Sequence, residues 1–382
     1  MSARTGEVAV VGVAEAGIGR AELGQTPLDL IGVATRRALD DAGLSVSEID
    51  GLFTASAYYF LPGLSVGEYL GITPKFSDST NNGGSSFVSH LFHAASAITA
   101  GLCDVALVVY GSTQASDSGR LVSRSEVSVY ESPFRPRYPV TGYALAASRH
   151  MYQYGTTREQ LAAVAVAARA WAMLNPLAVA REPLTIDDVL SSRMISSPLT
   201  VRDCCLVTDG AAAVILTSAS RARSLRRPPV YLLGAGEAQS HRDISQMPDL
   251  TTTAATESSR RAYRAAGVTV KDIDVVELYD AFTINTILFL EDLGFCQKGE
   301  GGQFVASGAI GPGGSLPVNT NGGGLSYCHP GMYGLFLVVE AVRQLRGEAG
   351  ARQQQADVIL VHGNGGILAS QVTAILGTES TI

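Results

Sequence analysis

The sequence predicts an α/β protein built from two duplicated halves, each rich in strand–helix–strand units. Three observations lead to this fold class. The chain has 382 residues, which is more than one ordinary domain needs. One segment recurs later in the chain, and each half contains a glycine-rich turn that enters a helix.

The recurring segment is ALDDAGLSVSEIDGL (38–52), which matches AYRAAGVTVKDIDVV (262–276) at a constant offset of 224. Each copy predicts an amphipathic helix that ends at a glycine, Gly43 or Gly267. A polar segment and a strand follow in both copies. This pattern indicates an internal duplication.

Buried strands are expected next, at CDVALVVYGS (103–112) and ADVILVHGNG (356–365), as in parallel sheets that are covered by helices. The glycine-rich turns NNGGSSFVSHLFHAASAITAG (81–101) and NGGGLSYCHPGMYGLFLVVEAVRQLRG (321–347) occupy corresponding places. Two equivalent turns point helix N-termini towards a shared cleft, where backbone N–H groups can stabilise an anionic oxygen.

The halves are predicted at 1–220 and 228–382, joined by the basic linker SASRARSLRRPP (218–229). The first half is longer because of an insertion at about 115–200. Long insertions of this kind usually cover a ligand.

Two features stand out within the insertion. SPFRPRYPV (132–140) carries Arg135 and Arg137, which fit a solvated loop better than a phosphate contact. The capping box TTRE (156–159) predicts the start of a helix.

Composition excludes several classes of function. A net charge of −7 gives no basic surface for nucleic acid. No apolar run has the roughly 18 to 20 uncharged residues of a membrane span, and we expect no secretory signal. Hydrophobic residues make up 46% and charged residues 16%, so we expect a homodimer that buries apolar surface between its subunits.

The five cysteines are odd in number and lack C-x-x-C spacing, which argues against a disulfide framework and against a zinc site. A reducing cytoplasm is the expected location, and no metal is expected on this chain.

The chain resembles the thiolase superfamily over nearly its whole length. CHPGMYG (328–334) is similar to the family's histidine motif G-H-P-x-G-x-x-G. DGAAAVIL (209–216) ends the first half as in thiolases. ELYDAFTIN (277–285) stands where thiolases have N-E-A-F, and VHGNGG (361–366) where they have C-x-G-G-G. The resemblance implies a five-layered α-β-α-β-α sandwich.

The thiol chemistry of thiolases is missing from these motifs. The nucleophile motif C-x-[ST]-G aligns with GGSS and places Gly83 where the cysteine belongs. The second cysteine falls at His362, or at Ala281 in the sterol-carrier type, and neither residue can replace a thiol. Cys328 replaces the first glycine of the histidine motif and is expected to fill core space. The other four cysteines are expected in the core.

Tyrosines are the candidates that remain. The resemblance places Tyr279 at the asparagine of N-E-A-F, which in thiolases forms an oxyanion site with the motif histidine, here His329. Tyr327 and Tyr333 flank that histidine, and a phenol can exchange a proton with an alkoxide. The predicted catalytic group is therefore Tyr279, His329, Tyr327 and Tyr333.

This pattern resembles the lipid-transfer-protein-like aldolases of steroid side-chain degradation, which lack the thiolase cysteines. The resemblance implies retro-aldol cleavage of a β-hydroxyacyl-CoA to a shorter acyl-CoA and a ketone or aldehyde. Coenzyme A is then part of the substrate, and the chain carries no cofactor of its own. The resemblance also implies a small partner protein with an OB fold and a zinc ribbon.

Two alternatives stay open on the sequence. The chain could be a thiolase-type acyltransferase that uses Cys328. It could also be a non-catalytic subunit that binds acyl-CoA and positions a partner. The sequence does not specify the acyl chain, the residues that contact coenzyme A, or which tyrosine is the base.

Overall fold

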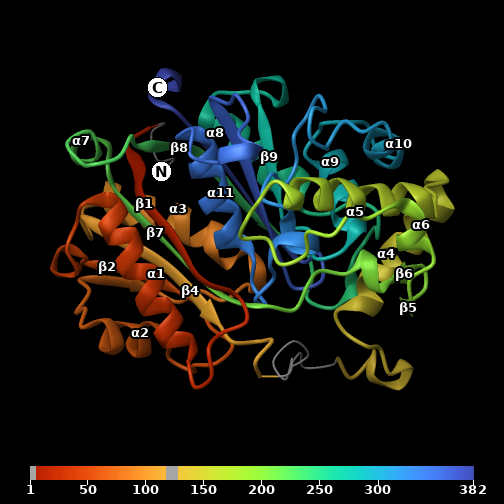
Figure 1. Cartoon of the computed structure of the whole chain (residues 1–382), viewed down its shortest axis with the longest axis horizontal. Coiled ribbons are helices and arrows are strands. Elements are labelled where there is room, and N and C mark those ends of the chain that lie inside the picture. The colour runs from red at the N-terminus through yellow and green to blue at the C-terminus, as the bar shows by residue number, and fades with distance from the viewer. Residues whose placement is uncertain (1–5, 118–127) are drawn as a thin grey trace.

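The computed structural model describes residues 6–117 and 128–382 and confirms the predicted α/β class (Figure 1). The strand order of its main sheet is β3-β2-β4-β7-β1-β8-β11-β10-β9. These strands are β1 (Val8–Gly19), β2 (Gly51–Thr54), β3 (Phe76–Asp78), β4 (Val105–Ser112), β7 (Asp209–Ser218), β8 (Val230–Gln239), β9 (Val275–Leu278), β10 (Val358–Gly365) and β11 (Ser370–Gly377).

The internal duplication is visible in this order. From β1 outwards the first half runs β7, β4, β2, and from β8 outwards the second half runs β11, β10, β9. The pairing directions also correspond, because β2 is parallel to β4 as β9 is to β10. The halves join edge to edge where β1 pairs with β8, at Ala9 with Tyr231 and Val10 with Val230.

Helices complete the layers. α1 (Pro27–Ala42) packs on the strands of the first half, and α8 (Ala255–Ala266) packs on β8 and β11. Between the halves lie α3 (Ser86–Thr99) and α11 (Gly334–Leu345), which contact each other and strands of both halves. The strands of the two halves thus lie on opposite sides of α3 and α11, in the predicted order of helix, sheet, helix, sheet, helix, although the pairing of β1 with β8 joins them into one sheet.

The repeated segment folds the same way twice. α1 and α8 both end at a left-handed glycine, Gly43 with φ 74° and Gly267 with φ 71°. A short 3-10 turn then leads into β2 or β9. Both C-cap glycines were predicted from sequence.

Over residues 115–117 and 128–200, the part of the predicted insertion that the structure describes, the chain forms helices and short strands at the right of Figure 1, whereas residues 118–127 lie outside the described residues. The elements of the insertion are α4 (Val140–Tyr154), α5 (Arg158–Met173), α6 (Ile186–Leu190), β5 (Met194–Ser196) and β6 (Leu199–Thr200). The predicted capping box is one residue off, because the box is formed by Thr157 and Gln160. The hydroxyl of Thr156 lies instead 2.8 Å from Nδ1 of His150.

The remaining helices are α2 (Pro62–Leu70), α7 (Ala219–Ala222), α9 (Thr283–Asp292) and α10 (Gly301–Ala306). α7 lies within the predicted linker. Arg135 and Arg137 are exposed, as expected of a solvated loop. No helix in residues 6–117 and 128–382 is long and apolar enough to cross a membrane.

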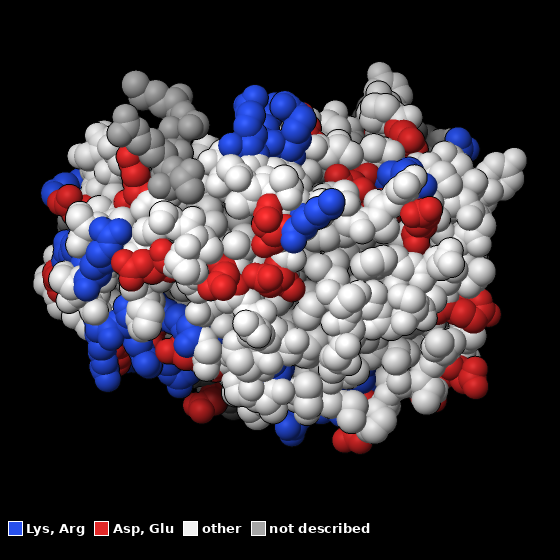
Figure 2. Space-filling view, turned by 90° about the horizontal axis from the view of Figure 1, so that it is seen from above, with Lys and Arg blue, Asp and Glu red and all other residues white. Residues whose placement is uncertain are grey.

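Charges are sparse on the face seen in Figure 2. Arginines and lysines lie among acidic side chains there, and broad areas carry no charge. This face therefore offers no continuous basic surface for a polyanion.

Candidate active site

A cavity of about 380 Å³ lies where the two halves and the insertion meet. Both glycine-rich turns reach it. The second half contributes Tyr279, His329, Gly331 and Asn364 to the lining of the cavity. The first half contributes Gly83, Gly84, Tyr110, Ser112 and Gln114, and the insertion contributes Pro139, Val140 and Tyr143.

Tyr279 and His329 form a hydrogen-bonded pair in the wall of this cavity. The hydroxyl of Tyr279 lies 3.1 Å from Nε2 of His329, and the two rings meet edge to face. The backbone N–H of Tyr333 donates to the same hydroxyl at 3.2 Å. The phenol oxygen is thus held by two groups from the segment of the histidine motif.

Tyr279 is placed by the end of β9. Its backbone N–H donates to the carbonyl of His362 at 3.0 Å, and its carbonyl accepts from the side chain of Asn285 at 3.3 Å. The parallel pairing of β9 with β10 therefore fixes where the phenol points.

Burial keeps both members of the pair neutral. It lowers the pKa of His329 to about 4, although a hydrogen bond with its own backbone acts in the opposite direction. Burial also raises the pKa of Tyr279 well above its usual value. At neutral pH the pair therefore consists of a neutral imidazole and a neutral phenol. The phenol can pass its proton to the imidazole when the oxygen of a bound substrate gives the phenol another proton.

Asp280 holds the turn that carries the histidine. Its Oδ1 accepts from the backbone N–H of Gly324 at 2.6 Å, in the π-turn Gly323–Tyr327. Burial raises the pKa of Asp280 to about 7, and the hydrogen bond from Gly324 opposes that rise. Asp280 does not line the cavity, so we regard it as a positioning residue.

Tyr333 lies behind the pair. Its hydroxyl donates to Oδ1 of Asn321 at 2.8 Å, and its ring centroid is 6.1 Å from that of His329. The side chain is fully buried and is not part of the cavity lining. Its backbone N–H, rather than its hydroxyl, reaches Tyr279.

Tyr327 is not brought together with the other three candidates. It is absent from the cavity lining, and its buried hydroxyl has no hydrogen-bond partner among the described residues. Burial and then the charge of Glu15 raise its pKa. The sequence placed Tyr327 beside His329, but the π-turn directs its side chain elsewhere.

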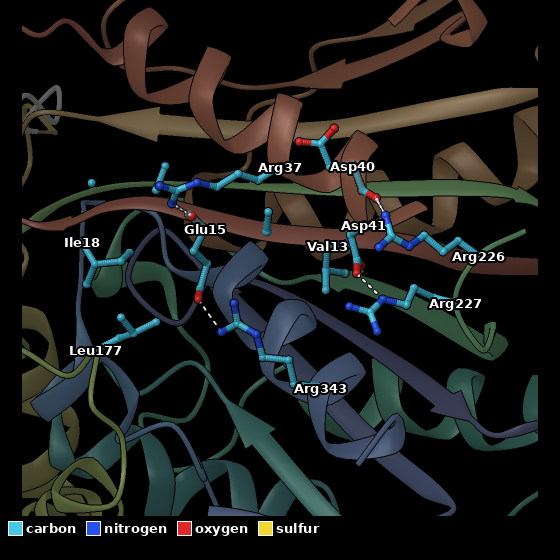
Figure 3. Close-up of a pocket in the computed structure, with 13 residues that line it drawn as sticks. Val13, Glu15, Ile18, Arg37, Asp40, Asp41, Leu177, Arg226, Arg227 and Arg343 are labelled. Carbon is cyan, nitrogen blue, oxygen red and sulfur yellow. Dashed lines mark hydrogen bonds and ion pairs between the residues drawn. The ribbon is translucent and has the colours of Figure 1, made fainter. Parts of the chain in front are cut away.

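Glu15 belongs to a second, charged cavity of about 540 Å³ (Figure 3). Its carboxylate pairs with Nη1 of Arg343 at 2.5 Å, and Asp41 pairs with Arg227 at 2.8 Å. These charges largely satisfy one another between α1, α11 and the linker.

No side chain stands at the position of the thiolase nucleophile, because the residue there is Gly83. Gly83 and its neighbour Gly84 both line the cavity. A Cβ on Gly84 would lie 2.2 Å from Cε2 and 2.5 Å from the hydroxyl oxygen of Tyr279. The tyrosine ring therefore occupies the space that a side chain at Gly84 would need, whereas a Cβ on Gly83, the position of the thiolase cysteine, would meet the backbone of Gly365 and Gly366.

The positions of the cysteines agree only in part with the expectation that all of them lie in the core. Cys328 is fully buried and does not line the cavity, as expected of core filler. Cys204 and Cys205 were expected in the core, but both line the cavity. Burial raises the pKa of Cys204 to about 12 and also raises the pKa of Cys205, so both are neutral thiols.

The positions of the second thiolase cysteine also lack a thiol. His362 is fully buried, with Nε2 2.8 Å from Gln371 and Nδ1 2.9 Å from Thr373, and it does not line the cavity. Ala281 does line it.

Several lining residues were missed by sequence reasoning. Tyr143 of α4 donates to the carbonyl of Gly366 at 3.0 Å and accepts from Asn364 at 2.8 Å. Tyr58 lies 3.3 Å from the hydroxyl of Ser112. No motif marks these residues, because the folding of the insertion and of the loop after β2 brings them in. Among the described residues no cluster of His, Cys, Asp or Glu could hold a metal ion.

Comparisons with known proteins identify the family of this chain. Residues 236–378 match the family described as "Thiolase C-terminal domain-like". An acetyl-CoA acetyltransferase of Methanothermobacter thermautotrophicus is 36% identical over 94% of this chain and 96% of its own length. A 17-hydroxy-3-oxo-4-pregnene-20-carboxyl-CoA lyase of Mycobacterium tuberculosis is 33% identical over 90% of this chain and 92% of its own.

A solved structure described as "Ltp2-ChsH2(DUF35) aldolase" superposes with a TM-score of 0.89 at 30% identity, over 98% of both chains. The fold is thus a thiolase fold with a histidine and a tyrosine at its centre. This chain belongs to the thiolase superfamily, and its relatives there include proteins described as a lyase and as an aldolase.

Proposed function

We propose that this chain is a carbon–carbon lyase that cleaves a β-hydroxyacyl-CoA thioester of the steroid side-chain type by a retro-aldol reaction. The observation that carries the proposal is the hydrogen-bonded pair Tyr279–His329 in the wall of a cavity whose nucleophile position, Gly83, carries no thiol. The relationship to an aldolase and to a lyase supports the same reaction class.

The pair accounts for the proton transfers. The substrate's β-hydroxyl gives its proton to the oxygen of Tyr279, and the phenolic proton passes to Nε2 of His329, 3.1 Å away. The bond between the α and β carbons breaks, the β carbon becomes the carbonyl of a ketone or aldehyde, and the electron pair moves to the thioester oxygen as an enolate. The proton then returns to the α carbon, which gives the shorter acyl-CoA.

The buried site favours this sequence. A charged imidazole is costly in the cavity, which is why the pKa of His329 is lowered to about 4. The imidazolium forms only as the enolate appears beside it, so each charge stabilises the other in a medium of low dielectric constant. No covalent acyl-enzyme is needed.

Tyr333 serves this scheme as a positioning residue through its backbone N–H. Tyr327 is left out, because its hydroxyl faces neither the cavity nor the pair.

The test is an assay for cleavage of a β-hydroxyacyl-CoA. Its readout is the release of a shorter acyl-CoA and of a ketone or aldehyde. Wild type and Cys328→Ala should cleave at similar rates, because the sulfur of Cys328 lies outside the cavity. An inactive Cys328→Ala beside active Tyr279→Phe and His329→Ala variants would establish the thiolase alternative.

The acyl-CoA-binding subunit remains the other alternative. It predicts binding of acyl-CoA without turnover, even when a partner is supplied. The two protein names joined in the description of the related aldolase support a partner for this chain. We propose a small protein with an OB fold and a zinc ribbon, together with a homodimer of this chain in the cytoplasm. Co-purification and light scattering test the partner and the dimer.

A further inference from the structure

Gln114 is a buried amide that the proton transfers above do not use. It follows β4, is 4% exposed and lines the active-site cavity. Its backbone N–H donates to Ser112 at 3.2 Å. Within residues 6–117 and 128–382, no group hydrogen-bonds to its side-chain amide.

The amide lies next to the catalytic pair. A Cβ on Gly331 would come within 2.4 Å of Oε1 of Gln114. The carbonyl of the same Gly331 is 3.4 Å from the hydroxyl of Tyr279. Gln114 and Tyr279 therefore meet the same short piece of the histidine motif.

The amide borders the cavity and has no hydrogen-bond partner among the described residues, so a ligand atom in the cavity can complete its hydrogen bonds. The retro-aldol reaction has two oxygens to serve. The β-hydroxyl must lose a proton, which an amide cannot take. The thioester oxygen gains negative charge and needs only a hydrogen-bond donor, which the N–H₂ of a glutamine supplies.

We propose that Nε2 of Gln114 donates a hydrogen bond to the thioester oxygen of the substrate and stabilises the enolate that forms there. This inference rests on the proposed function for its catalytic part. For binding it requires only an acyl-CoA thioester in the cavity. Gln114 is then a catalytic residue from the first half, while the acid–base pair comes from the second.

The experiment compares Gln114→Met, which keeps the length of the side chain and removes its donor, with wild type. The binding probes are propionyl-CoA and S-propyl-CoA, which differ only in the thioester carbonyl. We expect wild type to bind the thioester about tenfold more tightly, because a lost hydrogen bond of this kind costs about that factor. The preference should disappear in Gln114→Met, KM for the thioester substrate should rise by up to about tenfold, and kcat should fall by about 10² to 10³.

Tyr58→Phe is the matched control. Tyr58 lines the same cavity, but its hydroxyl already faces Ser112 at 3.3 Å, so the carbonyl preference should survive. Gln114→Glu provides a second variant if the methionine does not fold, since it keeps the shape and lacks the N–H₂ donor. It should also lose the preference.

The inference is overturned if both folded variants keep the wild-type preference for the thioester, whatever happens to turnover. A kcat loss with an unchanged preference would identify a structural role instead. If wild type cleaves no β-hydroxyacyl-CoA but the preference still vanishes in Gln114→Met, the retro-aldol proposal falls and Gln114 stands as the thioester-binding group.

Discussion

The two glycine-rich turns are equivalent in the duplicated fold, yet only one carries acid–base side chains into the site. The first turn, Gly83–Ser85, enters α3 and brings two glycines to the cavity. The second enters α11 and brings His329. The turns touch, since a Cβ on Gly334 would lie 2.4 Å from the carbonyl oxygen of Gly84.

The difference shows how one scaffold holds two chemistries. A thiolase needs a cysteine side chain on the first turn, whereas this chain has glycines at 83 and 84 and packs the ring of Tyr279 against Gly84. Variants in the two turns should show that the second half holds the acid–base chemistry and that the first half must leave room for it.

Removing the phenol should have the largest effect. Tyr279→Phe keeps the ring and deletes the hydroxyl that contacts His329, so kcat should fall by about 10² to 10⁴ while the fold is kept. Tyr231→Phe is the control, because Tyr231 is also buried and does not line the cavity. Equal activity of Tyr279→Phe and wild type would rule out the proposed base.

His329→Ala should follow, with a loss of about 10²-fold in kcat, because the phenol then has no acceptor for its proton. Steady-state kinetics measures this loss. The double variant with Tyr279→Phe should be little worse than Tyr279→Phe alone, since the two groups act as a unit. Fully additive losses would show that the two residues act independently.

In the first turn, Gly84→Ala should lower kcat by about 10²-fold, because its Cβ needs the space of the Tyr279 ring and a displacement of about 1 Å can cost that much. In a Tyr279→Ala background the same change should cost almost nothing. A crystal structure of Gly84→Ala with the ring unmoved and with full activity would contradict the steric argument.

Tyr333→Phe and Tyr327→Phe should have smaller and unequal effects. Tyr333 loses its hydrogen bond to Asn321, which should lower the free energy of unfolding by about 1 kcal/mol, with much less effect on kcat than Tyr279→Phe. Tyr327→Phe deletes a hydroxyl without a partner among the described residues and should be close to neutral in both measurements. A large loss of kcat in Tyr327→Phe would show that Tyr327 belongs to the active site after all.

The last prediction concerns stability, not catalysis, and tests how pH acts on the second turn. Because burial raises the pKa of Asp280 from 3.8 to about 7, the folded state keeps a proton that the unfolded state has already lost. The free energy of unfolding of wild type, relative to Asp280→Asn, should therefore fall as pH rises from about 4 to about 7 and stay level above. Denaturant titrations across this range measure the difference. A rise over the same range would mean that the carboxylate is stabilised instead.

Much of this structure was predictable from sequence. The repeat at 38–52 and 262–276 predicted two equivalent helix–turn–strand units, because helix amphipathicity and a C-cap glycine are local features. The pair Tyr279 and His329 was predicted because motif positions in this fold meet in one cleft.

The rest depended on packing that local sequence does not encode. Tyr327 is only two residues from His329, but the π-turn sends its side chain away from the cavity. Cys204, Cys205 and Gln114 line the cavity because separate loops converge there, and none of them stands in a recognisable motif.

The central claim is that the carbon–carbon bond is cleaved without a thiol nucleophile. The most direct measurement is the intact mass of the protein, quenched in acid while it is cleaving a β-hydroxyacyl-CoA. Our account predicts the unmodified mass of the chain at every time point, with acyl-CoA and ketone or aldehyde accumulating together. A species heavier by the acyl group during turnover, absent in a cysteine variant that has also lost activity, would contradict it.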